Sequence, residues 1–172
     1  MSSNASIKGH PVHSMLVAFP IGLLGFSLVA DVLDRVTQNP SWSTVAFYTL
    51  GGGLVGALLA AVPGLVDLVS MRDPQAKRIG ITHMVTNLLA VGVLAVSFFL
   101  RWDGDPGGLP FALSFLGVVL LGVGGWLGGE MVYVHGVAVQ PTKPGPRAET
   151  GFEMAPPPPR YVPEQSTKHR AG

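Results

Sequence analysis

Four long apolar segments dominate the pattern of hydrophobic and polar positions along the chain. They cover about residues 12–33, 44–69, 76–100 and 110–137, and no Asp, Glu, Lys or Arg occurs within 15–30, 44–66, 79–100 or 110–129. A helix needs about 20 apolar residues, at about 1.5 Å each, to cross roughly 30 Å of hydrocarbon. The pattern therefore predicts four membrane-spanning helices.

Short polar connections separate the four segments, at residues 34–43, 72–78 and 101–109. Short links make consecutive helices antiparallel neighbours. We therefore expect an all-α fold, an antiparallel four-helix membrane bundle within residues 1–139. Pro20 and Pro63 lie inside spans and predict kinks, because proline has no N–H to bond the carbonyl one turn earlier.

The character of the chain changes at residue 140, where apolar periodicity ends and prolines become frequent. Such a segment cannot bury enough apolar surface to fold alone. We expect residues 140–172 to form a flexible cytoplasmic tail, with a polyproline-II patch at 156–159.

Composition narrows the function classes. The chain is 48% hydrophobic and 12% charged, with a formal net charge of +1 and no cysteine. No basic patch indicates nucleic acid as a partner. Without cysteine the chain forms no disulfide and supplies no thiolate to an iron–sulphur cluster. Any metal must be held by His, Met or oxygen ligands.

The distribution of positive charge predicts the orientation of the spans. Four spans place both termini and the 72–78 connection on one side, which carries nine of the eleven Lys and Arg residues, whereas the other side has only Arg35 and Arg101. Lys and Arg are enriched in cytoplasmic loops. Both termini are therefore predicted to be cytoplasmic, and Asp31 and Asp34 are expected at the opposite surface with Arg35 and Arg101.

Ligating and ionisable side chains gather at the predicted cytoplasmic end of the bundle. His10 and His13 are expected to start the first helix, His83 lies early in the third span, and His135 ends the fourth. Asp67 and Glu130 fall in the same layer. Every span thus contributes to one end, and no histidine lies at the other.

Helical spacing sharpens this picture. His135 stands above Gly124 and Gly128, which form a stripe without side chains, and His83 shares a face with Asn87. Stripes of small residues let a neighbouring helix or a flat ligand approach closely, and of the two we favour helix packing for the stripes as such.

A planar macrocycle needs an imidazole from each of two helices and small residues along its faces. The sequence therefore suggests b-type haem held between His10 or His13 and His83 or His135, with the Gly124 and Gly128 groove beside it. The cationic residues Arg72, Lys77 and Arg78 are placed to pair with haem propionates at the membrane surface.

These residues are also compatible with three other roles. A non-haem metal could be held by His13, His83 and His135 with nearby carboxylates, although no Glu-x-x-His pair occurs. Asp67, Asn87 and Glu130 could orient the ring N–H groups or form a proton path to a quinone. The histidines could also serve only as helix caps.

Two terminal motifs carry a resemblance to a known family. The stretches GHPVHSMLVAFPIGLLGFSLVADVL and GGWLGGEMVYVHGVAV, with Arg78-x-x-x-x-His83 between them, resemble an uncharacterised bacterial family of four-helix membrane proteins, a domain of unknown function. The resemblance covers about residues 9–139, and His10, His13, His83 and His135 match its motif positions. This chain has Ala18 at a position where many relatives have a further histidine. The lack of that histidine argues against a second cofactor here.

The resemblance also implies a cellular setting. Some members of that family are fused or adjacent to Rieske iron–sulphur domains, which implies electron transfer in the bacterial cytoplasmic membrane. We therefore expect a multi-pass redox subunit with haem b, rather than a stand-alone enzyme, with other membrane subunits, a quinone or a Rieske-type protein as partners. The alternatives are a structural or assembly subunit of a larger complex and, third, a non-haem metal site.

Overall fold

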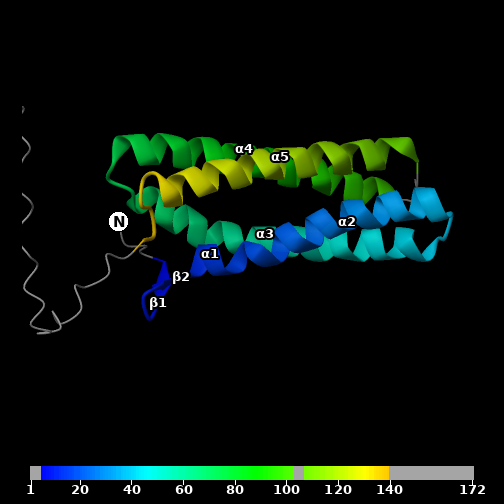
Figure 1. The fold of residues 1–172 in the computed structure, drawn as a ribbon, viewed down its shortest axis with the longest axis horizontal. Coiled ribbons are helices and arrows are strands. Elements are labelled where there is room, and N and C mark those ends of the chain that lie inside the picture. The colour runs from blue at the N-terminus through cyan, green and yellow to red at the C-terminus, as the bar shows by residue number, and fades with distance from the viewer. Residues whose placement is uncertain (1–4, 103–106, 140–172) are drawn as a thin grey trace, which may run out of the picture. The chain divides into compact units, whose positions relative to one another are not determined.

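The computed structural model describes residues 5–102 and 107–139, and the predicted tail at 140–172 lies outside these residues. Four helical crossings run side by side (Figure 1): α1 Val12–Leu16 followed by α2 Ala18–Thr37, then α3 Ser41–Ser70, α4 Pro74–Trp102 and α5 Gly108–Tyr133. All four are long and apolar enough to cross a membrane. The predicted all-α four-helix membrane bundle is confirmed.

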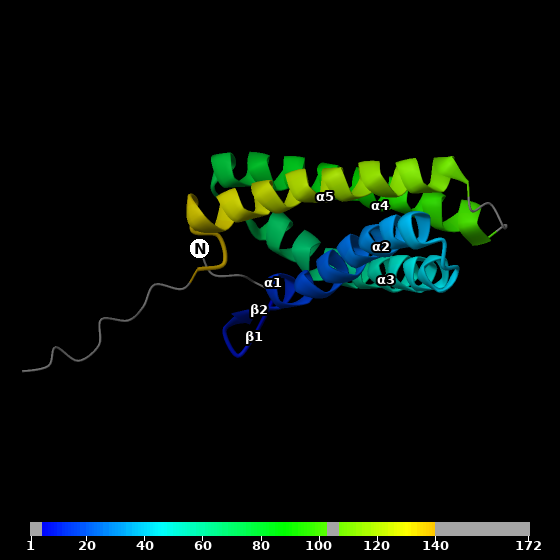
Figure 2. The same cartoon turned by 45° about the vertical axis from the view of Figure 1, so that its right-hand side comes forward.

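The bundle consists of two helical hairpins. Helix α2 packs along α3, and α4 packs along α5, with fewer contacts between the two pairs (Figure 2). Short connections close the first hairpin and join the two. After α2 the backbone turns at Gln38, whose φ is 53°, and before α4 the Asp73 carboxylate accepts a hydrogen bond from the Gln75 N–H at 3.0 Å. These connections make sequence neighbours antiparallel, as predicted.

Leucine side chains seated on glycines form the centre of the bundle. Leu24 of α2 and Leu94 of α4 are fully buried in one cluster with Leu50. A Cβ added at Gly53 would lie less than 3.0 Å from Leu24, and one at Gly117 would be as close to Leu94. Each hairpin is therefore closed by a leucine that fits into the space above a glycine of its partner helix.

The first crossing is interrupted as its proline predicts. Pro20 cannot donate to the carbonyl of Leu16, and the chain divides into α1 and α2 at Val17, within the turn that precedes this proline. Helix α3, by contrast, runs continuously through Pro63. The kink matters for the site because it separates the short helix α1 from the rest of the crossing.

A small β-hairpin that was not predicted from the sequence precedes α1. Strands β1 Ser6–Ile7 and β2 His10–Pro11 pair antiparallel. Lys8 and Gly9 join them with φ of 50° and 82°, which is the backbone of a type I′ turn. The prediction that His10 starts the first helix is therefore wrong, because this residue lies in a strand that leads into α1.

Helix α5 ends four residues earlier than predicted. Its last residue is Tyr133, and Gly136 follows with a φ of 61°, while the Val137 N–H donates to the Met131 carbonyl at 2.9 Å. A glycine in the left-handed region is a common way to stop a helix. His135 thus lies in the turn after α5 and does not end the helix itself.

Candidate functional site

Two of the predicted site histidines meet at one end of the bundle. His13 of α1 and His83 of α4 have ring centroids 6.3 Å apart, and their planes cross at 87°. Both side chains are half-buried. In the part of the chain that the structure describes, no such ring contact joins His10 or His135 to this pair.

Each imidazole is held by a hydrogen bond to the backbone of a neighbouring helix. His13 donates from Nδ1 to the Ala60 carbonyl of α3 at 2.8 Å, and His83 donates from Nδ1 to the Gly124 carbonyl of α5 at 2.8 Å. A carbonyl only accepts, so Nδ1 carries the proton in both rings. The lone pair of a neutral ring is then on Nε2.

Glycines give the two imidazoles their space. A Cβ at Gly64 would lie 2.8 Å from Nδ1 of His13, and a Cβ at Gly128 would lie 3.1 Å from Cε1 of His83. Gly124 faces the Asn87 amide in the same way. The stripe of Gly124 and Gly128 thus faces side chains of α4, which is the helix packing that the sequence favoured for such stripes.

Asn87 supports His83 on its own helix. Its Nδ2 donates to the His83 backbone carbonyl at 2.8 Å and lies 3.3 Å from both ring nitrogens. Equal distances to the two ring nitrogens place the amide nitrogen beside the ring and not in line with either nitrogen. Asn87 therefore contacts His83, while the ring N–H itself is bonded to the Gly124 carbonyl.

The remaining predicted residues lie around this pair without joining it. The Asp67 carboxylate accepts a hydrogen bond from the Ala5 N–H at 3.0 Å and so anchors the N-terminal segment. Glu130 is half-buried near the end of α5, and Arg72 and Arg78 are exposed. Within residues 5–102 and 107–139, no three His, Asp or Glu side chains are grouped closely enough to hold a metal ion.

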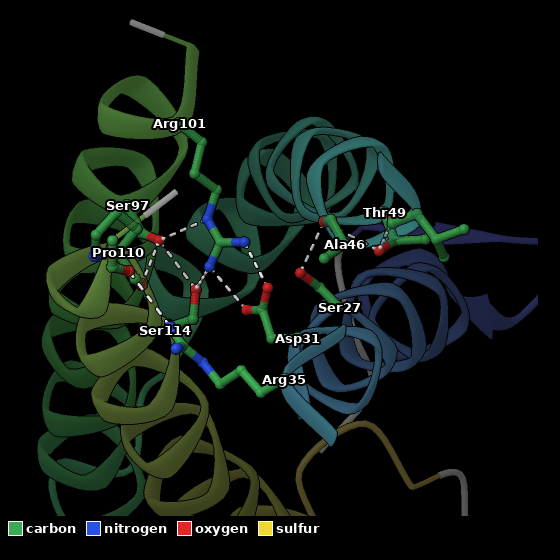
Figure 3. A network of polar contacts seen from close by, with 11 residues as sticks. Ser27, Asp31, Arg35, Ala46, Thr49, Ser97, Arg101, Pro110 and Ser114 are labelled. Carbon is green, nitrogen blue, oxygen red and sulfur yellow. Dashed lines mark hydrogen bonds and ion pairs between the residues drawn. The ribbon is translucent and has the colours of Figure 1, made fainter. Parts of the chain in front are cut away.

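A second polar cluster at the opposite end of the bundle was not predicted (Figure 3). Arg101 of α4 binds Asp31 of α2 through two hydrogen bonds, NH1 to Oδ1 at 2.5 Å and NH2 to Oδ2 at 2.7 Å. The Arg101 side chain is 12% exposed and that of Asp31 7%. Arg101 also donates to Ser114 at 3.0 Å and to Ser97 at 3.3 Å.

Sequence reasoning placed Asp31 and Arg101 at this end but treated them as surface charges, which are common where helices leave a membrane. A signal was present in the spacing, since Ser97 lies four residues before Arg101 and Ser27 four residues before Asp31. Residues four apart share one face of a helix. What the sequence could not show is that these two faces point at each other.

The two clusters have a common architectural role. One joins α2 to α4 through the ion pair, and the other brings α1 and α4 together through the histidines. The polar contacts between the hairpins therefore lie at the two ends of the bundle, with the leucine core between them.

Comparison with known proteins gives a family and no activity. No curated protein and no solved structure matches the chain significantly. A family model described as a predicted membrane protein, DUF2231, matches residues 9–141. This match covers most of the chain and includes all four helical crossings. The protein therefore belongs to the DUF2231 family of predicted membrane proteins.

Proposed function

We propose that the protein is a membrane electron-transfer subunit that binds b-type haem through His13 and His83. The arrangement of the two imidazoles carries this proposal. The two rings come from different crossings, and their centroids are 6.3 Å apart. Because Nδ1 of each ring is bonded to a backbone carbonyl, His13 and His83 would hold the haem iron through Nε2.

The surroundings of the two rings support the same role. A hydrogen bond from Nδ1 to a carbonyl fixes the ring and makes Nε2 a better ligand, and both histidines have such a bond. When bound, haem supplies reversible one-electron chemistry. The exposed cations Arg72 and Arg78 are suited to pair with its propionates.

The wider setting is part of the same proposal. A subunit of this kind would exchange electrons with a quinone or with an iron–sulphur protein of the Rieske type. The excess of Lys and Arg at the histidine end would make this end cytoplasmic, in a bacterial inner membrane. Because the two histidines belong to different helices, assembly of the bundle would also depend on binding of the haem.

A structural or assembly subunit is the second candidate, and one observation favours it. The Nδ1 bonds of His13 and His83 tie α1 to α3 and α4 to α5, which is useful without any cofactor. A hydrogen bond of this kind contributes about 1 kcal/mol. In this alternative the histidines stabilise a bundle that supports a larger complex.

Optical spectra separate the two candidates. The full chain, purified in detergent from haem-replete cells, should show a Soret band and an α band that appears on reduction. His13→Ala and His83→Ala should each abolish both bands, whereas His10→Ala and His135→Ala are matched controls that should keep them. A colourless, metal-free wild type would refute haem binding and favour the structural subunit. Bleaching by the control variants would refute the choice of axial pair.

A further inference from the structure

A cavity of about 340 Å³ opens at the end of the bundle that lies opposite the histidine pair. All four helical crossings contribute to its wall, and the lining side chains used below are Asp34, Arg35, Tyr48, Arg101 and Phe111. Cavities that bind small molecules have volumes of about 300–1,000 Å³ and contain a few well-placed polar groups. This cavity, defined by the described residues, lies within that range and is lined by charges of both signs.

The buried ion pair of Asp31 and Arg101 forms a part of the cavity lining that has no net charge. Arg101 donates to both oxygens of Asp31, to Ser97 and to Ser114. These bonds use four of the five N–H donors of its guanidinium. The pair therefore contributes no net charge to a ligand, and the selectivity of the cavity depends on the charges along its wall.

Arg35 is positioned by contacts that leave most of its donors available. Its guanidinium carbon lies 4.2 Å from the centre of the Phe111 ring, and its NH2 donates to the Gly107 carbonyl at 3.3 Å. Stacking uses one face of the planar group, and the hydrogen bond uses one donor. The free edge of such a guanidinium matches the two oxygens of a phosphate or carboxylate. Figure 3 shows Arg35 extending from α2 beside the ion pair.

Asp34 supplies a negative charge on the same wall. Within residues 5–102 and 107–139, the only ion pair is that between Arg101 and Asp31, so Asp34 and Arg35 are not paired with each other. Among the described lining residues, Asp34 and Arg35 are thus a negative and a positive group that form no ion pair with each other. A simple anion would leave Asp34 repelling it, and a simple cation would be repelled by Arg35.

We propose that this cavity binds a zwitterion in which a phosphate or carboxylate is joined by a short linker to a primary ammonium group. Arg35 binds the anion, Asp34 accepts hydrogen bonds from the ammonium, and the ring of Tyr48 lies beside the cation. Two sources carry this chemistry: the headgroup of phosphatidylethanolamine, or a soluble zwitterion such as phosphoethanolamine. The proposal concerns a site at the other end of the bundle and does not depend on haem.

Lipid selectivity tests the proposal on the intact chain. The detergent-purified protein is mixed with phosphatidylethanolamine, phosphatidylcholine and phosphatidylglycerol and examined by native mass spectrometry, and phosphoethanolamine is titrated in a calorimeter. Phosphatidylcholine has no N–H for Asp34, and phosphatidylglycerol has no cation for it. Loss of one charge-assisted hydrogen bond weakens binding by about tenfold or more. We therefore expect phosphatidylethanolamine to be retained about tenfold better than either of the other lipids.

Variants identify the site. Arg35→Leu and Asp34→Asn should each weaken retention by about tenfold, and Arg35→Lys, which keeps the charge without the planar edge, should weaken it less. Asp73→Asn makes the same change at the other end of the bundle, keeps a side-chain oxygen for the Gln75 N–H, and should leave lipid retention unchanged. Because the comparison of lipids uses the wild type, it stands even if Arg35→Leu fails to fold.

The outcomes assign the source of the ligand or overturn the site. Selective retention of phosphatidylethanolamine without binding of phosphoethanolamine supports a lipid ligand. Binding of phosphoethanolamine that is weakened in Asp34→Asn and in Arg35→Leu supports a soluble one. Equal retention of the three lipids together with no binding of phosphoethanolamine overturns the proposal, as does wild-type binding by both Asp34→Asn and Arg35→Lys.

Discussion

Removal of the Arg101 guanidinium should destabilise the bundle far more than removal of any exposed cation. In Arg101→Leu the Asp31 carboxylate, whose side chain is 7% exposed, loses the group that binds both of its oxygens. Breaking a buried pair by removing one partner costs about 3–5 kcal/mol. We expect a loss of about 3–5 kcal/mol.

The same reasoning predicts the effect of a second substitution. Asp31→Leu combined with Arg101→Leu removes both charges and should lie within about 1 kcal/mol of wild type. Ser97 and Ser114 bond each other at 2.9 Å in the wild type, and we expect them to keep this bond in the double variant.

Unfolding by SDS in mixed micelles, followed by tryptophan fluorescence, measures these differences in the free energy of unfolding. Arg78→Leu removes an exposed cation from the same helix and should stay within about 0.5 kcal/mol of wild type. The reasoning is refuted if Arg101→Leu loses less than about 1 kcal/mol at pH 7. It is also refuted if the double variant is no more stable than the single one.

Three further predictions use the same assay or a simple probe of the N-terminal segment. Gly53→Ala should lose about 1–3 kcal/mol because its Cβ would overlap a leucine of α2, whereas Gly25→Ala, with nothing within 4 Å, should be neutral or gain up to about 1 kcal/mol; equal effects would contradict the packing. Gly64→Ala should displace the His13 ring and lose about 1–3 kcal/mol, and unchanged stability would argue against that contact. Asp67→Ala removes the bond to the N–H of residue 5 and should speed amide exchange over residues 5–12; unchanged exchange would show that the bond does not anchor this segment.

The number, type and order of the helices followed from the sequence, because hydrocarbon imposes its constraint locally. An apolar run of sufficient length must form a helix to satisfy its own backbone, whatever surrounds it. The same local chemistry predicted the interruption of the first crossing at Pro20. The end at which the histidines gather followed from counting spans.

Local signals failed where a turn decided the outcome. The β-hairpin before α1 depends on Lys8 in a left-handed conformation, which lysine seldom adopts. The stop after α5 depends on Gly136, one of many glycines in this chain. Neither residue type indicates its own backbone angle, so His10 and His135 were assigned to helices that do not contain them.

Partner choice across the bundle was decided only by the tertiary structure. Periodicity shows which residues share a helix face, but the rotation of each helix about its axis depends on packing against its neighbours. In this bundle the seating of Leu24 and Leu94 over glycines sets that rotation. The rotation then brings His13 to His83 and Asp31 to Arg101. Helix interfaces in lipid are selected by close packing and by hydrogen bonds between buried polar groups. Both are properties of a pair of helices, so neither can be predicted from one helix alone.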